Sequence, residues 1–88
     1  MVDTITVLDA VSGFASEVSG VAKADITDKT KLKTTLGMTR GDLMTFCDLV
    51  GEFIKQFNPN QTMPFDVVDK KDQTVGGVSS DAETRCRA

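Results

Sequence analysis

Histidine is absent from this 88-residue chain, and cysteine occurs only twice. Histidine is the commonest general base near neutral pH and the commonest metal ligand. Without it, we expect neither metal-dependent chemistry nor a catalytic triad, and we predict no metal site. A domain of this size buries only about 60% of the surface that its unfolded chain exposes, so a large enclosed active site has little room. The composition therefore predicts a protein that is not an enzyme.

Long apolar runs and an excess of positive charge are also missing. No stretch approaches the roughly 18 apolar residues of a membrane span, and residues 1–4 lack the basic segment and apolar run of a signal peptide. Ten basic and thirteen acidic residues give a net charge of −3, which disfavours nucleic acids and anionic membranes as partners. We therefore expect a monomeric, acidic, cytoplasmic protein with no membrane span and no nucleic-acid partner.

Two segments carry the apolar spacing of amphipathic helices. The first covers about residues 4–20, where Asp3 or Thr4 suits the start and Gly20 suits the end. The second begins at Thr39, which can form a capping box with Asp42, and ends at Asn58-Pro59 because proline interrupts a helix. The predicted buried faces are Ile5, Leu8, Val11, Phe14 or Ala15, Val18 and Val21 in the first helix, and Leu43, Phe46, Cys47, Val50, Ile54 and Phe57 in the second.

The connection between these helices, residues 21–38, has no helical period. A connection of this length is uncommon in a small domain unless it packs against the core or has a function. Its isolated apolar residues predict a long loop that is fixed to the core by three anchors, Ile26, Leu32 and Leu36.

The C-terminal third gives weaker signals. Residues 60–72 hold a short apolar cluster that fits either one helical turn or an extended segment. Thr74 can cap a last helix, although Gly76 and Gly77 each weaken it by roughly 1 kcal/mol relative to alanine. Its predicted apolar face consists of Val75, Val78, Ala82 and Cys86.

Together these segments predict an all-α fold, a bundle of three or four helices with a long loop between the first two. We place the helical domain at residues 1–78. Residues 79–88 are either a frayed tail or the end of the weak last helix, and we expect this end of the chain to be mobile.

The order of these parts resembles the acyl carrier proteins, over roughly residues 4–78. The residues that carry the resemblance are Ile26-Thr27-Asp28-Lys29-Thr30-Lys31-Leu32, Leu36-Gly37-Met38 and Asp72-Gln73-Thr74-Val75-Gly76. In that family a similar loop leads into Leu-Gly-x-Asp-Ser-Leu at the start of the second helix. The resemblance implies a four-helix carrier fold and a role in fatty-acid, polyketide or related acyl biosynthesis.

The sequence departs from the family at the attachment site. In the family, the serine hydroxyl is joined to phosphopantetheine, whose thiol carries acyl groups. An ungapped match from Leu36-Gly37 puts Thr39 at the aspartate and Arg40 at the serine, and no serine occurs between Ser19 and Ser79. Arginine has no hydroxyl to modify, and Thr39 is better suited to capping the helix. We therefore expect no phosphopantetheine cofactor.

The resemblance also indicates where partners dock, because enzymes of the family bind acidic residues along helix two. Here the candidates are Arg40, Asp42, Asp48 and Glu52, although charged residues on an outer helical face equally fit a solvated surface. The first functional hypothesis is a non-enzymatic protein that docks to biosynthetic enzymes or other carrier proteins. The alternatives are a true carrier with an atypical or disabled site at Thr39 and Arg40, and a regulatory or structural helical module unrelated to acyl transfer.

The two cysteines are expected to be free thiols, since the cytoplasm is reducing. Cys47 lies in the apolar stripe of the second helix and is expected in the core, where a thiol ionises poorly. Cys86 is near the C-terminus and is expected to be exposed.

Overall fold

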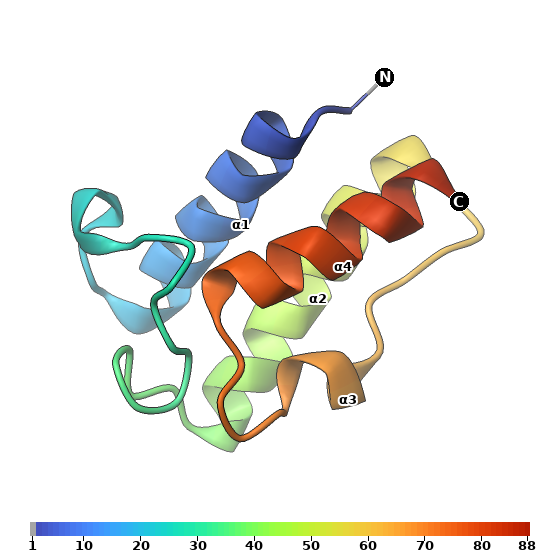
Figure 1. Ribbon diagram of the computed structural model, residues 1–88. Helices are drawn as coiled ribbons and strands as arrows, with labels where there is room; N and C mark the ends of the chain where they lie inside the picture. The colour runs from blue at the N-terminus through green and yellow to red at the C-terminus, as the bar shows by residue number, and fades with distance from the viewer. Residues whose placement is uncertain (1) are drawn as a thin grey trace.

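The structure is a computed structural model that describes residues 2–88, and helices dominate it (Figure 1). The predicted all-α class is confirmed, and within residues 2–88 there is no β-strand. No helix in this range has the length and apolar character that crossing a membrane requires. In chain order the elements are α1 (Thr4–Ser19), the short 3-10 helix η1 (Lys23–Asp25), α2 (Arg40–Phe57), α3 (Phe65–Val68) and α4 (Val75–Arg87).

Local capping rules set both ends of α1. The Asp3 carboxylate accepts a hydrogen bond from the Thr6 backbone N–H at 2.7 Å, which satisfies one of the free donors of the first turn. Gly20 follows the last residue with φ of 77°, in the left-handed region that glycine adopts without steric cost. The predicted bounds of this helix are therefore confirmed to within one residue.

The buried face of α1 is rotated from the predicted one. Val11 and Ala15 are buried as expected, but Val7 is also fully buried, whereas Ile5 is 81% exposed. Apolar residues cover so much of this helix that two overlapping stripes satisfy the same spacing. The packing partners α2 and α4 select the stripe, and sequence periodicity does not identify them.

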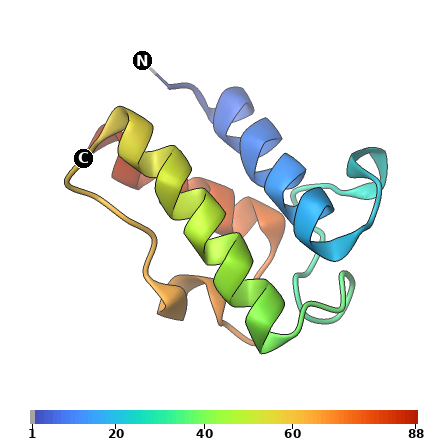
Figure 2. The ribbon, with the colours of Figure 1, turned by 180° about the vertical axis from the view of Figure 1, so that it is seen from behind.

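The core lies where α1, α2 and α4 pack against one another, as the view from behind shows (Figure 2). The predicted face of α2 is confirmed except at its last position. Phe57, the last residue of α2, is 43% exposed, and its ring packs on Phe53 with centroids 5.1 Å apart. The fully buried larger side chains are Phe46, Leu32, Leu43, Ile54, Val7, Val11, Val50, Val68, Val75 and Val78.

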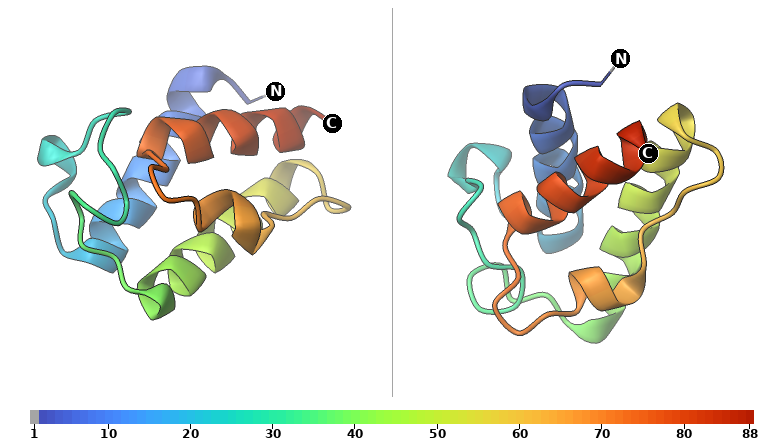
Figure 3. Two further views of the ribbon diagram at one scale, coloured as in Figure 1. Left: turned by 60° about the horizontal axis from the view of Figure 1, so that its bottom comes forward. Right: turned by 45° about the vertical axis from the view of Figure 1, so that its right-hand side comes forward.

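The long loop is fixed to the core, and its three predicted anchors, Ile26, Leu32 and Leu36, are all buried. It is also hydrogen-bonded to the chain around the start of α4, so that the two segments lie side by side (Figure 3). The contacts are Leu32 N–H to Gln73 O at 3.1 Å, Val75 N–H to Thr30 O at 2.9 Å and Gly76 N–H to Asp28 O at 2.8 Å. This pairing satisfies backbone groups that an irregular loop would otherwise bury without partners.

Residues 79–87, at the C-terminal end of the chain, lie within α4. Its face of Val75, Val78, Ala82 and Cys86 is buried as predicted. Exposure of Cys86 was expected and is wrong, because α4 continues to Arg87 and keeps this thiol only 8% exposed. The mobility expected of this end is a matter of dynamics and stays a prediction.

Candidate functional site

The start of α2 is built by a capping box. The Thr39 hydroxyl accepts a hydrogen bond from Asp42 N–H at 3.2 Å, and the Asp42 carboxylate accepts one from Thr39 N–H at 3.0 Å. Both predicted contacts of this box are present. The Thr39 hydroxyl and the Asp42 carboxylate are therefore engaged in capping the N-terminus of α2.

Arg40 is the first residue of α2. It contacts α3 and Asp69, the residue that directly follows α3. Its guanidinium carbon lies 4.9 Å from the centroid of the Phe65 ring, and its Nη1 lies 3.8 Å from Asp69 Oδ2. Lys33 from the long loop reaches the other oxygen of the same carboxylate, with Nζ 2.7 Å from Oδ1. The hydrogen bond from Lys33, with smaller contributions from the charges of Lys33 and Arg40, lowers the pKa of Asp69 below its usual value.

A row of exposed side chains runs along the outer face of α2 at intervals of four residues. Arg40, Met44, Asp48 and Glu52 form this row, and all four are exposed. Side chains four apart lie on one face of a helix, so three of the four predicted docking residues are brought together. Asp42 is not among them, because its position is on another side of the helix and its carboxylate is held in the capping box.

Met44 was not predicted as a site residue. It is 52% exposed, and it stands between Arg40 and Asp48 in the row. The sequence does contain this residue pattern, since Met44 lies four residues after Arg40 and four before Asp48. It is easily overlooked because single exposed apolar residues are common on protein surfaces.

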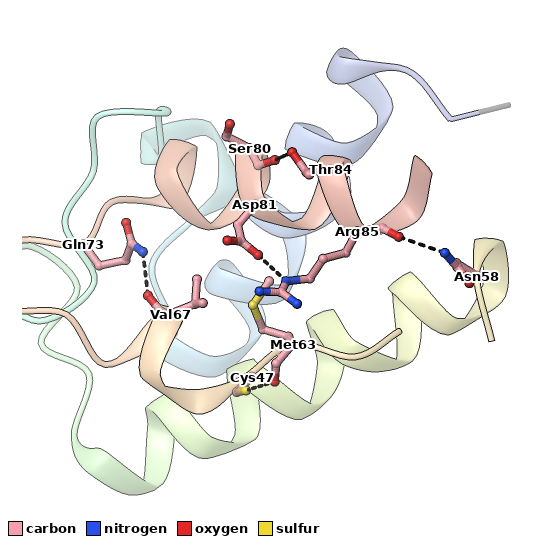
Figure 4. Close-up of polar contacts among 9 residues, drawn as sticks. All are labelled: Cys47, Asn58, Met63, Val67, Gln73, Ser80, Asp81, Thr84 and Arg85. Atoms are coloured by element: carbon pink, nitrogen blue, oxygen red, sulfur yellow. Dashed lines mark hydrogen bonds and ion pairs between the residues drawn. The ribbon is translucent and has the colours of Figure 1, made fainter. Parts of the chain in front are cut away.

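A groove of about 330 Å³ lies beside this row, between α2 and the segment that leads into α3. Within it, the Cys47 thiol donates a hydrogen bond to Met63 O at 3.1 Å, whereas the Met63 side chain points towards α4 (Figure 4). One turn later, a Cβ on Gly51 would lie 3.2 Å from the Thr62 hydroxyl, so this segment runs close to the helix. The residues that line the groove are Arg40, Met44, Cys47, Asp48, Met63 and Phe65.

Both cysteines are free and buried, and neither is set up as a nucleophile. Burial raises the pKa of the Cys47 thiol above its usual value, and the charge of Asp48 adds to the effect. Burial and the charge of Glu83 raise the pKa of Cys86 in the same way. Near neutral pH both side chains are therefore thiols rather than thiolates.

The hydroxyl and guanidinium groups at the start of α2 are engaged in contacts within the protein. The Thr39 hydroxyl is engaged in the helix cap, and the Arg40 side chain packs on Phe65 and pairs with Asp69. The nearest other hydroxyl in the helix, that of Thr45, donates to Gly41 O at 3.1 Å. Among residues 2–88, no group of three or more histidine, cysteine, aspartate and glutamate side chains is placed to hold a metal ion.

Comparison with known proteins adds no relative: a scan against protein-family models, a search of curated proteins and a search of solved structures each found no match to this chain. The architecture itself is that of a small helical bundle.

Proposed function

We propose that this protein is an acyl-carrier-like docking protein that is not an enzyme. In this proposal it binds enzymes of fatty-acid, polyketide or related acyl biosynthesis, or another carrier protein, and does not itself carry phosphopantetheine. The observation that carries the proposal is the row on α2, in which a half-exposed methionine stands among exposed charged residues. An apolar anchor surrounded by charges is typical of protein interfaces, where the centre is apolar and the rim is polar.

The electrostatics of the row favour a partner with basic residues. Arg40 is paired with Asp69, so its positive charge is partly neutralised within the protein. No ion pair is formed by Asp48 or Glu52 among the described residues, and both carboxylates are exposed. The partner surface is therefore expected to present an apolar recess for Met44 with lysine or arginine beside it.

Loading with phosphopantetheine tests the absence of the arm. The purified chain and an Arg40→Ser variant are each incubated with a promiscuous phosphopantetheinyl transferase and coenzyme A, and their intact masses are measured. We expect no gain for the natural chain, because it has no free hydroxyl at the start of α2. A gain on Arg40→Ser alone would support a carrier fold with a disabled site. A gain on the natural chain would refute the proposal.

Photocrosslinking tests the docking face. A photoreactive amino acid replaces Met44 in one variant, and Ser80, an exposed residue of α4, in a matched control. In an extract of the source cells, position 44 is expected to capture an acyl-transferring or condensing enzyme, or a carrier protein, as identified by mass spectrometry. Reversing the charges of Asp48 and Glu52 is expected to lower that capture by about tenfold, because like charges then face each other across the interface.

Equal capture at positions 44 and 80 would contradict the docking face. Capture at position 44 of proteins with no role in acyl chemistry would instead favour a helical interaction module of another kind. Retained capture after reversal of both charges would show that the acidic residues of the row do not select the partner.

A further inference from the structure

The segment between α2 and α4 is attached to the rest of the protein differently from the long loop. We call residues 59–69 the strap; it includes α3 and ends at Asp69. Within residues 2–88, the backbone–backbone hydrogen bonds of the strap stay inside it or go to the adjoining Asn58. The long loop, by contrast, is joined by backbone hydrogen bonds to residues 73–76. The strap is therefore held in place by side-chain contacts.

Two of these contacts are in the interior. Met63 is 4% exposed and Val68 is fully buried, so the strap contributes two apolar side chains to the core. The carbonyl of Met63 also accepts the hydrogen bond from the Cys47 thiol on α2. Moving the strap away from α2 would break this bond and bring solvent to Cys47, which is otherwise 7% exposed.

A further hydrogen bond, from Gln73 Nε2 to Val67 O at 2.6 Å, ties the strap to the segment before α4. The ion pairs of the strap are at the surface, and they meet at one carboxylate. Asp69 pairs with Lys33 of the long loop and with Arg40 of α2, and Arg40 also covers the Phe65 ring. Asp69 is thus the residue through which the end of the strap is tied to two other elements. The next carboxylate along the chain, Asp72, pairs with Lys31 at 3.8 Å, and among residues 2–88 it forms no ion pair with α2 or α3.

We propose that the strap is a lid over the groove beside α2, and that the Asp69 carboxylate is the latch that keeps it closed. With the latch in place, Arg40 and Phe65 hold α3 against the start of α2. Without it, the strap is retained by its interior contacts and by the hydrogen bond from Gln73 to Val67 O, and it opens more often while the three long helices stay folded. Segments held by few cross-element hydrogen bonds are those that open locally. The inference does not depend on the docking proposal.

Labelling of Cys47 with a thiol reagent measures this opening. All variants carry Cys86→Ala, so that Cys47 is the only thiol. Asp69→Asn keeps the shape of the side chain and removes its charge, and Asp72→Asn is the matched control. We expect Asp69→Asn to be labelled about fivefold faster than its parent, because two partly exposed ion pairs are lost. The Asp72→Asn rate is expected to stay within about twofold of the parent rate.

Salt provides a second measurement on the same proteins. Raising the ionic strength to about 1 M screens the ion pairs and is expected to accelerate labelling of the parent towards the Asp69→Asn rate. The Asp69→Asn rate itself should change little. Should Asp69→Asn fail to fold, Lys33→Gln with Lys31→Gln as its control tests the same latch from the loop side, and only Lys33→Gln is expected to be labelled faster.

Low concentrations of urea distinguish lid opening from global unfolding. Local opening exposes little surface, so its labelling rate is nearly independent of urea, whereas global unfolding has the full denaturant dependence of the protein. The proposal is overturned if Asp69→Asn is labelled no faster than Asp72→Asn. It is also overturned if the labelling of Asp69→Asn rises with urea as steeply as global unfolding does.

Discussion

Replacing Leu32 with alanine is expected to lower the free energy of unfolding by about 3 kcal/mol, although the residue lies in an irregular loop. Its side chain is fully buried. Its backbone is fixed on both sides, since Leu32 N–H donates to Gln73 O and Leu32 O accepts from Met38 N–H, each at 3.1 Å. The loop therefore cannot collapse freely into the cavity left by the missing atoms. Because small domains are stabilised by only about 5–15 kcal/mol, this is a large fraction of the total.

Ile5→Ala is the matched control for this substitution. Ile5 is the residue that helical spacing places on the buried face of α1, yet it is 81% exposed. Its replacement is expected to change the free energy of unfolding by no more than about 0.5 kcal/mol. Urea unfolding followed by circular dichroism measures both values. A loss at Ile5 as large as that at Leu32 would mean that the face of α1 is assigned incorrectly.

Replacing Gly76 with alanine is the second substitution expected to have a large effect. An added Cβ would lie 2.6 Å from Asp28 O, which is backbone, and the Gly76 N–H donates to that same oxygen at 2.8 Å. The methyl group must therefore push the loop away from the start of α4. We expect a loss of about 2 kcal/mol, because overpacking of this kind exceeds the gain of roughly 1 kcal/mol that alanine brings inside a helix.

Gly13 supplies the control, since it is also a helical glycine but has open space around it. No heavy atom lies within 4 Å of a Cβ built there. Gly13→Ala is therefore expected to stabilise the protein by about 0.5–1 kcal/mol. In a domain of this length, 1 kcal/mol shifts the melting temperature by about 4–8 °C, so thermal unfolding resolves the opposite signs. If both substitutions stabilised the protein, the close contact between Gly76 and Asp28 would be disproved.

The glycines of α4 illustrate what sequence reasoning missed. From propensity alone, Gly76 and Gly77 only weaken the helix. In the fold, Gly76 allows the backbone of the long loop to approach, and a Cβ at Gly77 would meet the Gln73 side chain. That side chain donates to Val67 O at 2.6 Å and accepts from Thr74 N–H at 3.1 Å. The Gly76 requirement arises between segments that are far apart in the chain, and the Gly77 requirement depends on how the nearby Gln73 side chain is held, so helix propensity contains neither.

Features with a local cause were predicted well. The ends of α1 and the start of α2 follow from Asp3, Gly20 and the capping box, which act within one helical turn. The anchors of the long loop were predicted because isolated apolar residues in a polar segment have a strong reason to be buried. The rotation of α1 and the burial of Cys86 were not, because both depend on how the helices pack.

The candidate site also has a part that the sequence predicts and a part that depends on tertiary packing. Asp48 and Glu52 share a face of α2 because of the helical repeat, which the sequence determines once the helix is known. The position of α3 beside Arg40 could not be predicted, because nothing local relates Phe65 and Asp69 to a residue at the start of α2. The contacts of Arg40 at the start of α2 are therefore tertiary contacts, which the sequence alone does not reveal.

The pairing of the long loop with the chain around the start of α4 also affects how the protein folds. Lys31 and Thr74 form an antiparallel bridge across a stretch of chain that contains the whole of α2 and α3. Helical bundles usually fold fast because most of their contacts are local in sequence. Here a distant loop closure must be completed before the first turn of α4 gains its backbone partners. This bundle therefore holds contacts more distant in sequence than its helix content suggests, which is expected to slow its folding.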